Sequence, residues 1–116
     1  MLNKNNRLKK RKEFSYIYKK GDSCASKYLI LWATPTKLDH VRFGFVVNKK
    51  VGKAHVRNLV KRRMRAIVRE ILPQVKKNNY ILVARDSLAE LSFEQMKEQI
   101  MYILTKHQYL EDNQCL

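Results

Sequence analysis

Apolar residues recur every three or four positions between residues 55 and 72, a spacing that is typical of an amphipathic helix. Pro73 follows directly and would end this helix, because proline cannot continue the backbone hydrogen-bond ladder. The apolar stripe consists of Val56, Val60, Met64, Ile67 and Ile71. The opposite side carries Asn58, Arg62, Arg65 and Arg69. One face is therefore expected to pack against a core, and the other face is basic.

Two shorter helices are predicted nearer the ends of the chain. In "KKRKEFSYIYKKG", residues 9–21, Phe14, Ile17 and Tyr18 lie at helical spacing and Gly21 marks a helix end. Ser92 and Gln95 form a capping box, a signature of a helix start. The apolar positions of this last helix are Phe93, Met96, Ile100, Ile103 and Leu104.

Three segments have the composition of strands: "SKYLILWAT" (26–34), "VRFGFVVN" (41–48) and "NYILVAR" (79–85). The first two are expected to be antiparallel neighbours, because they follow one another in the chain. These elements predict an α+β fold with a single sheet and flanking helices, in the order α-β-β(-β)-α-β-α. With 116 residues and no linker, the chain is expected to form one domain over 1–116. Residues 1–8 are predicted to be a mobile basic tail and residues 108–116 a frayed C-terminus.

The chain carries a formal charge of +15, from 25 Lys and Arg against ten Asp and Glu. Residues 1–69 hold 20 of the basic and only three of the acidic side chains. Such a surplus indicates a polyanionic partner, with nucleic acid first and an acidic membrane second. No apolar run approaches a membrane span or a signal peptide, so a cytoplasmic protein with free thiols at Cys24 and Cys115 is expected.

The basic side of the helix at 55–72 is unusual for a merely solvated surface, where opposite charges normally alternate. Three successive pairs of like charge stand four residues apart: Arg57/Lys61, Lys61/Arg65 and Arg65/Arg69. Each such pair costs roughly 0.2 to 0.5 kcal/mol of stability in the free protein. The compensating charge is therefore expected to come from outside as phosphates, which arginine binds in a bidentate manner.

The segment "KKVGKAHVRNLVKRRMR", residues 49–65, resembles the signature of the bacterial ribonuclease P protein family. Segments 8–21 and 79–85 are similar to that family's first helix and to its strand after the basic helix. Leu59 departs from the pattern, since the family often has arginine there. The resemblance and the charge pattern together suggest these RNA-binding residues: Lys49, Lys50, Lys53, Arg57, Asn58, Lys61, Arg62, Arg65 and Arg69.

The resemblance implies a holoenzyme in which a catalytic RNA and its Mg²⁺ ions remove the 5′ leader of precursor tRNA. The protein would bind the RNA and the leader, hold no cofactor of its own and need no protein partner or membrane. The implied fold is like the second domain of ribosomal protein S5, with a left-handed β-α-β crossover. Periodicity does not show this handedness, and the general expectation for such crossovers is the right-handed form.

No catalytic or metal-binding residue is predicted in the protein itself, because no cluster of carboxylates that could hold Mg²⁺ is visible. The histidines, His40, His55 and His107, are isolated in sequence, although folding could bring two of them together. A structural RNA- or DNA-binding protein and an autonomous nuclease remain the alternatives, ranked in that order after the ribonuclease P subunit.

Aromatic residues offer a second candidate surface, since unpaired bases stack on aromatic side chains in basic grooves. The resemblance implies a leader-binding cleft that contains Phe14, Tyr18 and Trp32, with Tyr28 as a weaker member on the same strand parity as Trp32. The alternative is that these side chains belong to the core. Core positions are predicted for Phe43, Phe45, Phe93 and Met96.

Overall fold

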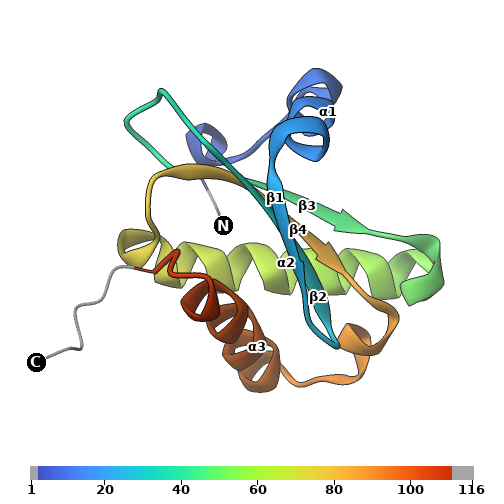
Figure 1. The fold of residues 1–116 in the computed structure, drawn as a ribbon. Coiled ribbons are helices and arrows are strands. Elements are labelled where there is room, and N and C mark those ends of the chain that lie inside the picture. Colours follow the sequence, from blue (N-terminus) through green and yellow to red (C-terminus); the bar gives the residue numbers. More distant parts are fainter. Residues whose placement is uncertain (1–2, 111–116) are drawn as a thin grey trace, which may run out of the picture.

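A four-stranded mixed sheet separates one small helix from two larger ones in the computed structural model, which describes residues 3–110 (Figure 1). Short 3₁₀ turns, η1 to η4, lie between the main elements. In chain order the elements are η1 (Lys4–Asn6), α1 (Arg11–Lys20), β1 (Asp22–Ala25), β2 (Leu29–Pro35), β3 (Arg42–Val47), η2 (Lys49–Val51), α2 (Ala54–Ile71), η3 (Leu72–Gln74), β4 (Asn78–Ala84), η4 (Asp86–Glu90) and α3 (Phe93–Lys106). This order confirms the predicted α+β class, including an additional early strand.

The strand order is β1-β2-β4-β3, and β4 pairs antiparallel with β2 but parallel with β3. The prediction that the first two long strands are antiparallel neighbours is therefore wrong, because β4 lies between them. The parallel pair β3 and β4 is joined by a crossover through α2, so the basic helix is part of the connection that builds the sheet. The handedness of this crossover remains an expectation from the family resemblance.

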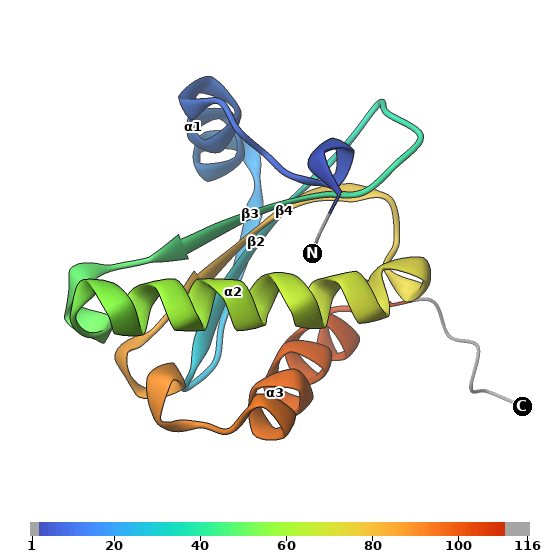
Figure 2. The ribbon, with the colours of Figure 1, turned by 180° about the vertical axis from the view of Figure 1, so that it is seen from behind.

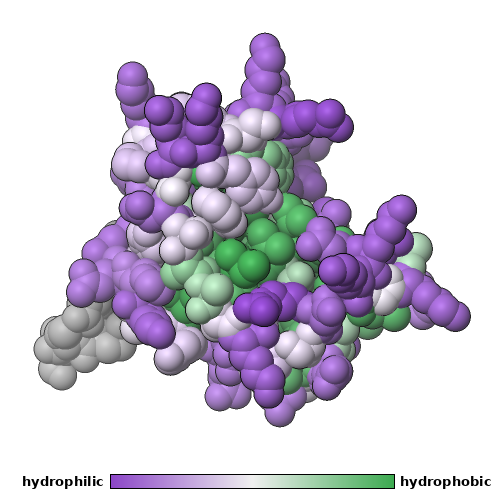
Figure 3. All heavy atoms as spheres, turned by 45° about the vertical axis from the view of Figure 1, so that its right-hand side comes forward, coloured by the Kyte–Doolittle hydropathy of each residue, from purple (hydrophilic) through white to green (hydrophobic). Residues whose placement is uncertain are grey.

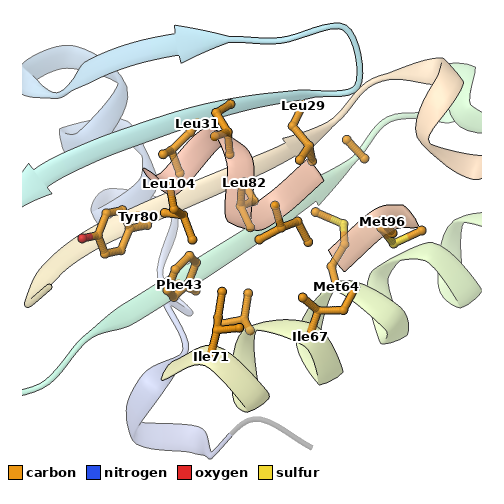
Figure 4. Close-up of a cluster of buried hydrophobic side chains, with 14 of the residues drawn as sticks. Leu29, Leu31, Phe43, Met64, Ile67, Ile71, Tyr80, Leu82, Met96 and Leu104 are labelled. Carbon is orange, nitrogen blue, oxygen red and sulfur yellow. The ribbon is translucent and has the colours of Figure 1, made fainter. Parts of the chain in front are cut away.

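The larger core lies between the sheet and the helices α2 and α3 (Figure 4). Alternate residues of the strands point into it, as the two-residue period of a strand requires, among them Leu31, Phe43 and Leu82. From α2 the stripe Val60, Met64, Ile67 and Ile71 is buried, while Val56 is half-buried. This confirms the predicted packing face of α2. No helix of residues 3–110 is long and apolar enough to cross a membrane.

On the opposite face of the sheet lies α1 (Figure 1), and within residues 3–110 this helix and Leu8 supply the cover. Ile17 and Leu8 are buried against Ile81, whereas the flanking apolar side chains of this face remain half-buried. Gly44 of β3 allows a close approach here. A Cβ at this position would lie 2.5 Å from the ring of Phe14, so glycine leaves the space that the ring occupies.

The N-terminal segment that was predicted to be a mobile tail lies along β3 at residues 3–8. The Leu8 amide donates to the Phe43 carbonyl at 2.8 Å, and the Asn6 side chain donates to the Val41 carbonyl at 2.7 Å. A single buried leucine and these hydrogen bonds dock a segment that has no apolar periodicity. Residues 1–2 lie outside the described part of the chain.

The chain after α3 is also paired where it is described. The Lys76 amide donates to the Tyr109 carbonyl at 2.7 Å, and Leu110 forms an antiparallel bridge with Val75. Residues 109 and 110, within the predicted frayed end, thus pair with the chain beside Val75. The remainder of the predicted frayed end, residues 111–116, lies outside the described part of the chain.

Candidate nucleic-acid interface

The turn between β3 and α2 places a group of lysines at the start of the basic helix. Gly52 has a φ of 156° and a ψ of −170°, a conformation that is almost confined to glycine, so the turn depends on it. The Arg57 Nε donates to the Gly52 carbonyl at 3.2 Å and so ties the helix to this turn. The predicted RNA-binding residues of this turn, Lys49, Lys50 and Lys53, are all exposed to solvent.

The basic side of α2 divides into two rows. Arg57, Lys61 and Arg65, spaced four residues apart, are half-buried along the side that faces β3 and the N-terminal segment. The outer row is exposed and consists of Asn58, Arg62 and Arg69. Leu59 is 37% exposed beside this row, so the departure from the family pattern is an apolar side chain at the surface.

The positive charge of α2 is not neutralised within residues 3–110. Glu70 is the only acidic residue of the helix, and its Oε1 accepts from the Lys97 Nζ of α3 at 2.8 Å. The negative charge of Glu70 is therefore balanced by Lys97 of α3 and not by the cations of α2. Neither row of α2 forms an ion pair in the described part of the chain, since the three ion pairs found there lie elsewhere or involve Glu70.

A groove of about 400 Å³ runs between the N-terminal segment and α2 at the open edge of β3. Figure 2, which views the molecule from behind, shows α2 on one side of β3 and the N-terminal turn and α1 on the other. Five basic and four apolar residues line the groove, namely Lys4, Arg7, Leu8, Lys9, Phe14, Phe43, Phe45, Lys61 and Arg65. The first wall of this groove, Lys4, Arg7 and Lys9, is absent from the predicted RNA-binding residues, because Lys4 and Arg7 fall in the predicted tail and Lys9 in the predicted first helix.

The aromatic candidates lie on the sheet face that carries α1, and they form two groups. The rings of Tyr18 and Trp32 meet edge to face with centroids 5.1 Å apart, and Tyr18 is 39% exposed. Phe14 lies further along, over Gly44 and beside the groove. None of the three is fully buried, so none is a pure core residue. Figure 3 shows an apolar area, ringed by hydrophilic side chains, on one exposed side of the molecule.

Tyr28 does not belong to this aromatic group, contrary to the prediction. It precedes β2, so the alternation of that strand does not apply to it, and it packs against the larger core on the other side of the sheet. Phe43 and Met96 are buried as predicted. Phe45 and Phe93 are half-buried against the same core, and Phe45 also lines the groove.

A polar network fixes the start of α1 on the sheet. The Glu13 carboxylate accepts from the backbone amides of Lys9 and Lys10 at 3.2 and 3.1 Å and from the Arg42 guanidinium. Arg42 in turn donates to the Asn79 side chain at 3.1 Å. Burial alone would raise the pKa of Glu13, but the two amides and Arg42 outweigh it and lower this pKa below its usual value. The network thereby holds the helix that carries Phe14 and Tyr18.

Within residues 3–110, no three His, Cys, Asp or Glu side chains converge on a position that could hold a metal ion. His40 contacts Asp39 at 3.1 Å, whereas His55 and His107 are exposed on α2 and at the end of α3. The histidines therefore lie on separate elements. Cys24 is a half-buried free cysteine in β1, and Cys115 falls outside the described residues.

Known proteins match this chain over nearly its whole length. The family model for ribonuclease P matches residues 2–108. The ribonuclease P protein component of Syntrophomonas wolfei is 41% identical over 91% of this chain and 90% of its own length. That of Bacillus velezensis is 37% identical over 90% and 91%, respectively.

The fold has solved counterparts as well. A Staphylococcus aureus RNase P protein, a mutant with defective mRNA degradation activity, matches with a TM-score of 0.87 and 30% identity, over 90% of each chain. The agreement extends from the family model and the sequence to the arrangement of helices and strands. The chain belongs to the ribonuclease P protein family.

Proposed function

We propose that this chain is the protein subunit of a ribonuclease P holoenzyme and assists the removal of 5′ leaders from precursor tRNA. The observation that carries this proposal is the uncompensated basic side of α2, which borders a groove with half-buried aromatic side chains. Cationic grooves with aromatic surfaces bind single-stranded nucleic acid. The family match adds the identity of the partners, the catalytic RNA and precursor tRNA.

In this proposal the protein binds and positions RNA, and phosphodiester hydrolysis belongs to the RNA subunit with its Mg²⁺. Magnesium prefers carboxylate and other oxygen ligands. The nine residues that line the groove include no carboxylate, and five of them are cationic, so the groove does not fit a metal site. The role left to these side chains is to hold phosphates by charge and bases by stacking.

Reconstitution tests the proposal directly. We expect the protein to restore precursor-tRNA cleavage by ribonuclease P RNA at a Mg²⁺ concentration that is too low for the RNA alone. The test variant is Arg62→Ala, which removes one exposed cation of α2 and should weaken this rescue without unfolding the protein. A protein that binds RNA but gives no rescue would instead be a structural RNA-binding protein, which the family match does not favour.

The isolated protein is expected to cleave neither precursor tRNA nor mRNA. An mRNA belongs in this assay because one solved relative is a mutant with defective mRNA degradation activity. The measurement is cleavage by RNA-free protein in the presence of Mg²⁺. Cleavage that one point substitution in this chain abolishes would contradict the assignment of catalysis to the RNA.

A further inference from the structure

The groove between the N-terminal segment and α2 contains two arginines that come from opposite walls. Arg7 belongs to the N-terminal segment beside β3, and Arg65 belongs to the inner row of α2. The two residues are 58 positions apart in the chain, and the docking of Leu8 on Phe43 brings their walls together. Of the two, only Arg65 is among the RNA-binding residues predicted from the sequence.

Both guanidinium groups carry a buried donor that the fold leaves without a partner. The Nε atoms of Arg7 and Arg65 are shielded from solvent and have no hydrogen-bond acceptor. Buried donors in folded proteins nearly always have one. Only three side-chain nitrogen or oxygen atoms in residues 3–110 share this state, and two of them belong to residues that line this groove. The pattern indicates an acceptor that arrives with a ligand.

The lining of the groove identifies the chemical class of that ligand. Lys4, Lys9 and Lys61 add three more cations, and no acidic side chain is among the nine lining residues. A phosphate presents several acceptor oxygens in a small volume and suits two guanidinium forks. Beside these cations, Phe14 and Phe45 supply an aromatic surface for a base, which must be unpaired to reach it.

We infer that Arg7 and Arg65 together clamp one phosphate of a single-stranded RNA, and that Phe14 lies next to the base of the same nucleotide. This inference rests on the proposed function and extends it. It assigns Arg7, a residue outside the basic helix, to RNA binding, and it makes the N-terminal segment one wall of the site. It also gives the inner row of α2, which faces the groove, a different role from that of the exposed Arg62.

A double-mutant cycle tests the clamp on the full-length protein with a short unstructured RNA oligonucleotide. Arg7→Ala and Arg65→Ala should each weaken binding by about tenfold, the loss expected for a charge-assisted hydrogen bond. The double variant should be hardly weaker than either single variant, because both arginines hold the same phosphate. The control cycle pairs Arg7→Ala with Arg62→Ala, whose effects should multiply, since Arg62 is exposed on the outer row.

Conservative replacements separate charge from geometry. Arg7→Lys and Arg65→Lys keep the net charge but lose the planar fork, so both should weaken the oligonucleotide binding several-fold. Arg11→Lys on the exposed start of α1 is the matched control and should not. Melting temperatures of all variants show that each one is folded.

The outcomes are distinct for the clamp and for the proposed function. Equal coupling in the Arg7/Arg65 and Arg7/Arg62 cycles, or lysine variants that bind as tightly as the wild type, would overturn the clamp. Neither outcome would affect the rescue of ribonuclease P RNA at low Mg²⁺. Loss of that rescue in the wild-type protein would overturn the proposed function, whereas the cycle on the oligonucleotide would still report on the clamp.

Discussion

The two faces of the sheet are built from alternate residues of the same strands, yet they are covered to very different extents. Leu31 and Leu82 point toward α2 and α3 and are fully buried. Their chain neighbours Trp32 and Val83 point toward α1 and remain half-buried. Covering one face with two helices is enough to form a core, and the thinner cover on the other face leaves apolar side chains within reach of a ligand.

The strongest test of this comparison uses two adjacent residues of β4. Leu82→Ala should lower the free energy of unfolding by about 2 to 5 kcal/mol, because it opens a cavity in the larger core. Val83→Ala should cost about 1 kcal/mol or less, since its side chain is already half-exposed. Chemical denaturation of both variants measures the difference. Equal losses would show that the two faces contribute alike to stability.

The second test asks whether the thinly covered face binds the leader. Trp32→Ala removes one of the two rings in the edge-to-face contact between Tyr18 and Trp32. It should reduce the preference of the holoenzyme for precursor over mature tRNA by about 1 to 3 kcal/mol, the contribution of one stacked base.

Two dissociation constants, with and without leader, give this preference for the wild type and the folded variant. Leu31→Ala is the matched control, since its side chain points to the other face. An unchanged preference in Trp32→Ala would return Trp32 to a purely structural role.

The third test concerns the approach of Phe14 to the sheet. Gly44→Ala places a Cβ where the ring lies, so it should cost about 1 to 2 kcal/mol of stability, within the range for overpacking. In a Phe14→Leu background the same substitution should cost less, because the smaller side chain yields the space. Denaturation of the four proteins in this cycle measures the coupling. Identical costs in both backgrounds would mean that Phe14 does not restrict position 44.

The smallest expected effect is the pH dependence of the contact that anchors α1. The pKa of Glu13 is lowered in the folded protein, so its ionised form stabilises the fold above the unfolded value of 4.5. That stabilisation is lost as the pH falls through the lower folded pKa. Wild type should therefore exceed Glu13→Gln in stability near pH 7, and the two should converge in the acid range. A difference that stays constant with pH would show that the carboxylate charge contributes nothing.

The sequence predicts well those elements whose periodicity is set by a single core. The stripe from Val60 to Ile71 and the capping box at Ser92, with its hydrogen bonds of 3.0 and 3.2 Å to Gln95, both appear in the structure as predicted. The helix pattern suffices there because local geometry determines which face is buried.

Strand pairing and the N-terminal wall of the groove could not be predicted in the same way. β2 and β3 follow one another in the chain, but β4 separates them, and this depends on long-range pairing that leaves no local periodic signal. β1 is a short polar strand at the sheet edge without apolar alternation. Arg7 enters the candidate site because Leu8 and a few hydrogen bonds dock its segment on β3, and a single apolar residue has no period.

The position of β4 also has a consequence for how the chain acquires its structure during synthesis. Within residues 3–110, β2 and β3 share no strand pairing, and both pair with β4, which leaves the ribosome after them. Until Ala84 has been made, the earlier strands have no common partner, and the apolar stripe of α2 lacks both the complete sheet and α3. Folding that waits for such distant contacts is slower and more cooperative than the assembly of local hairpins. A nascent chain that stops before residue 78 would hold its basic helix without the sheet that orients it.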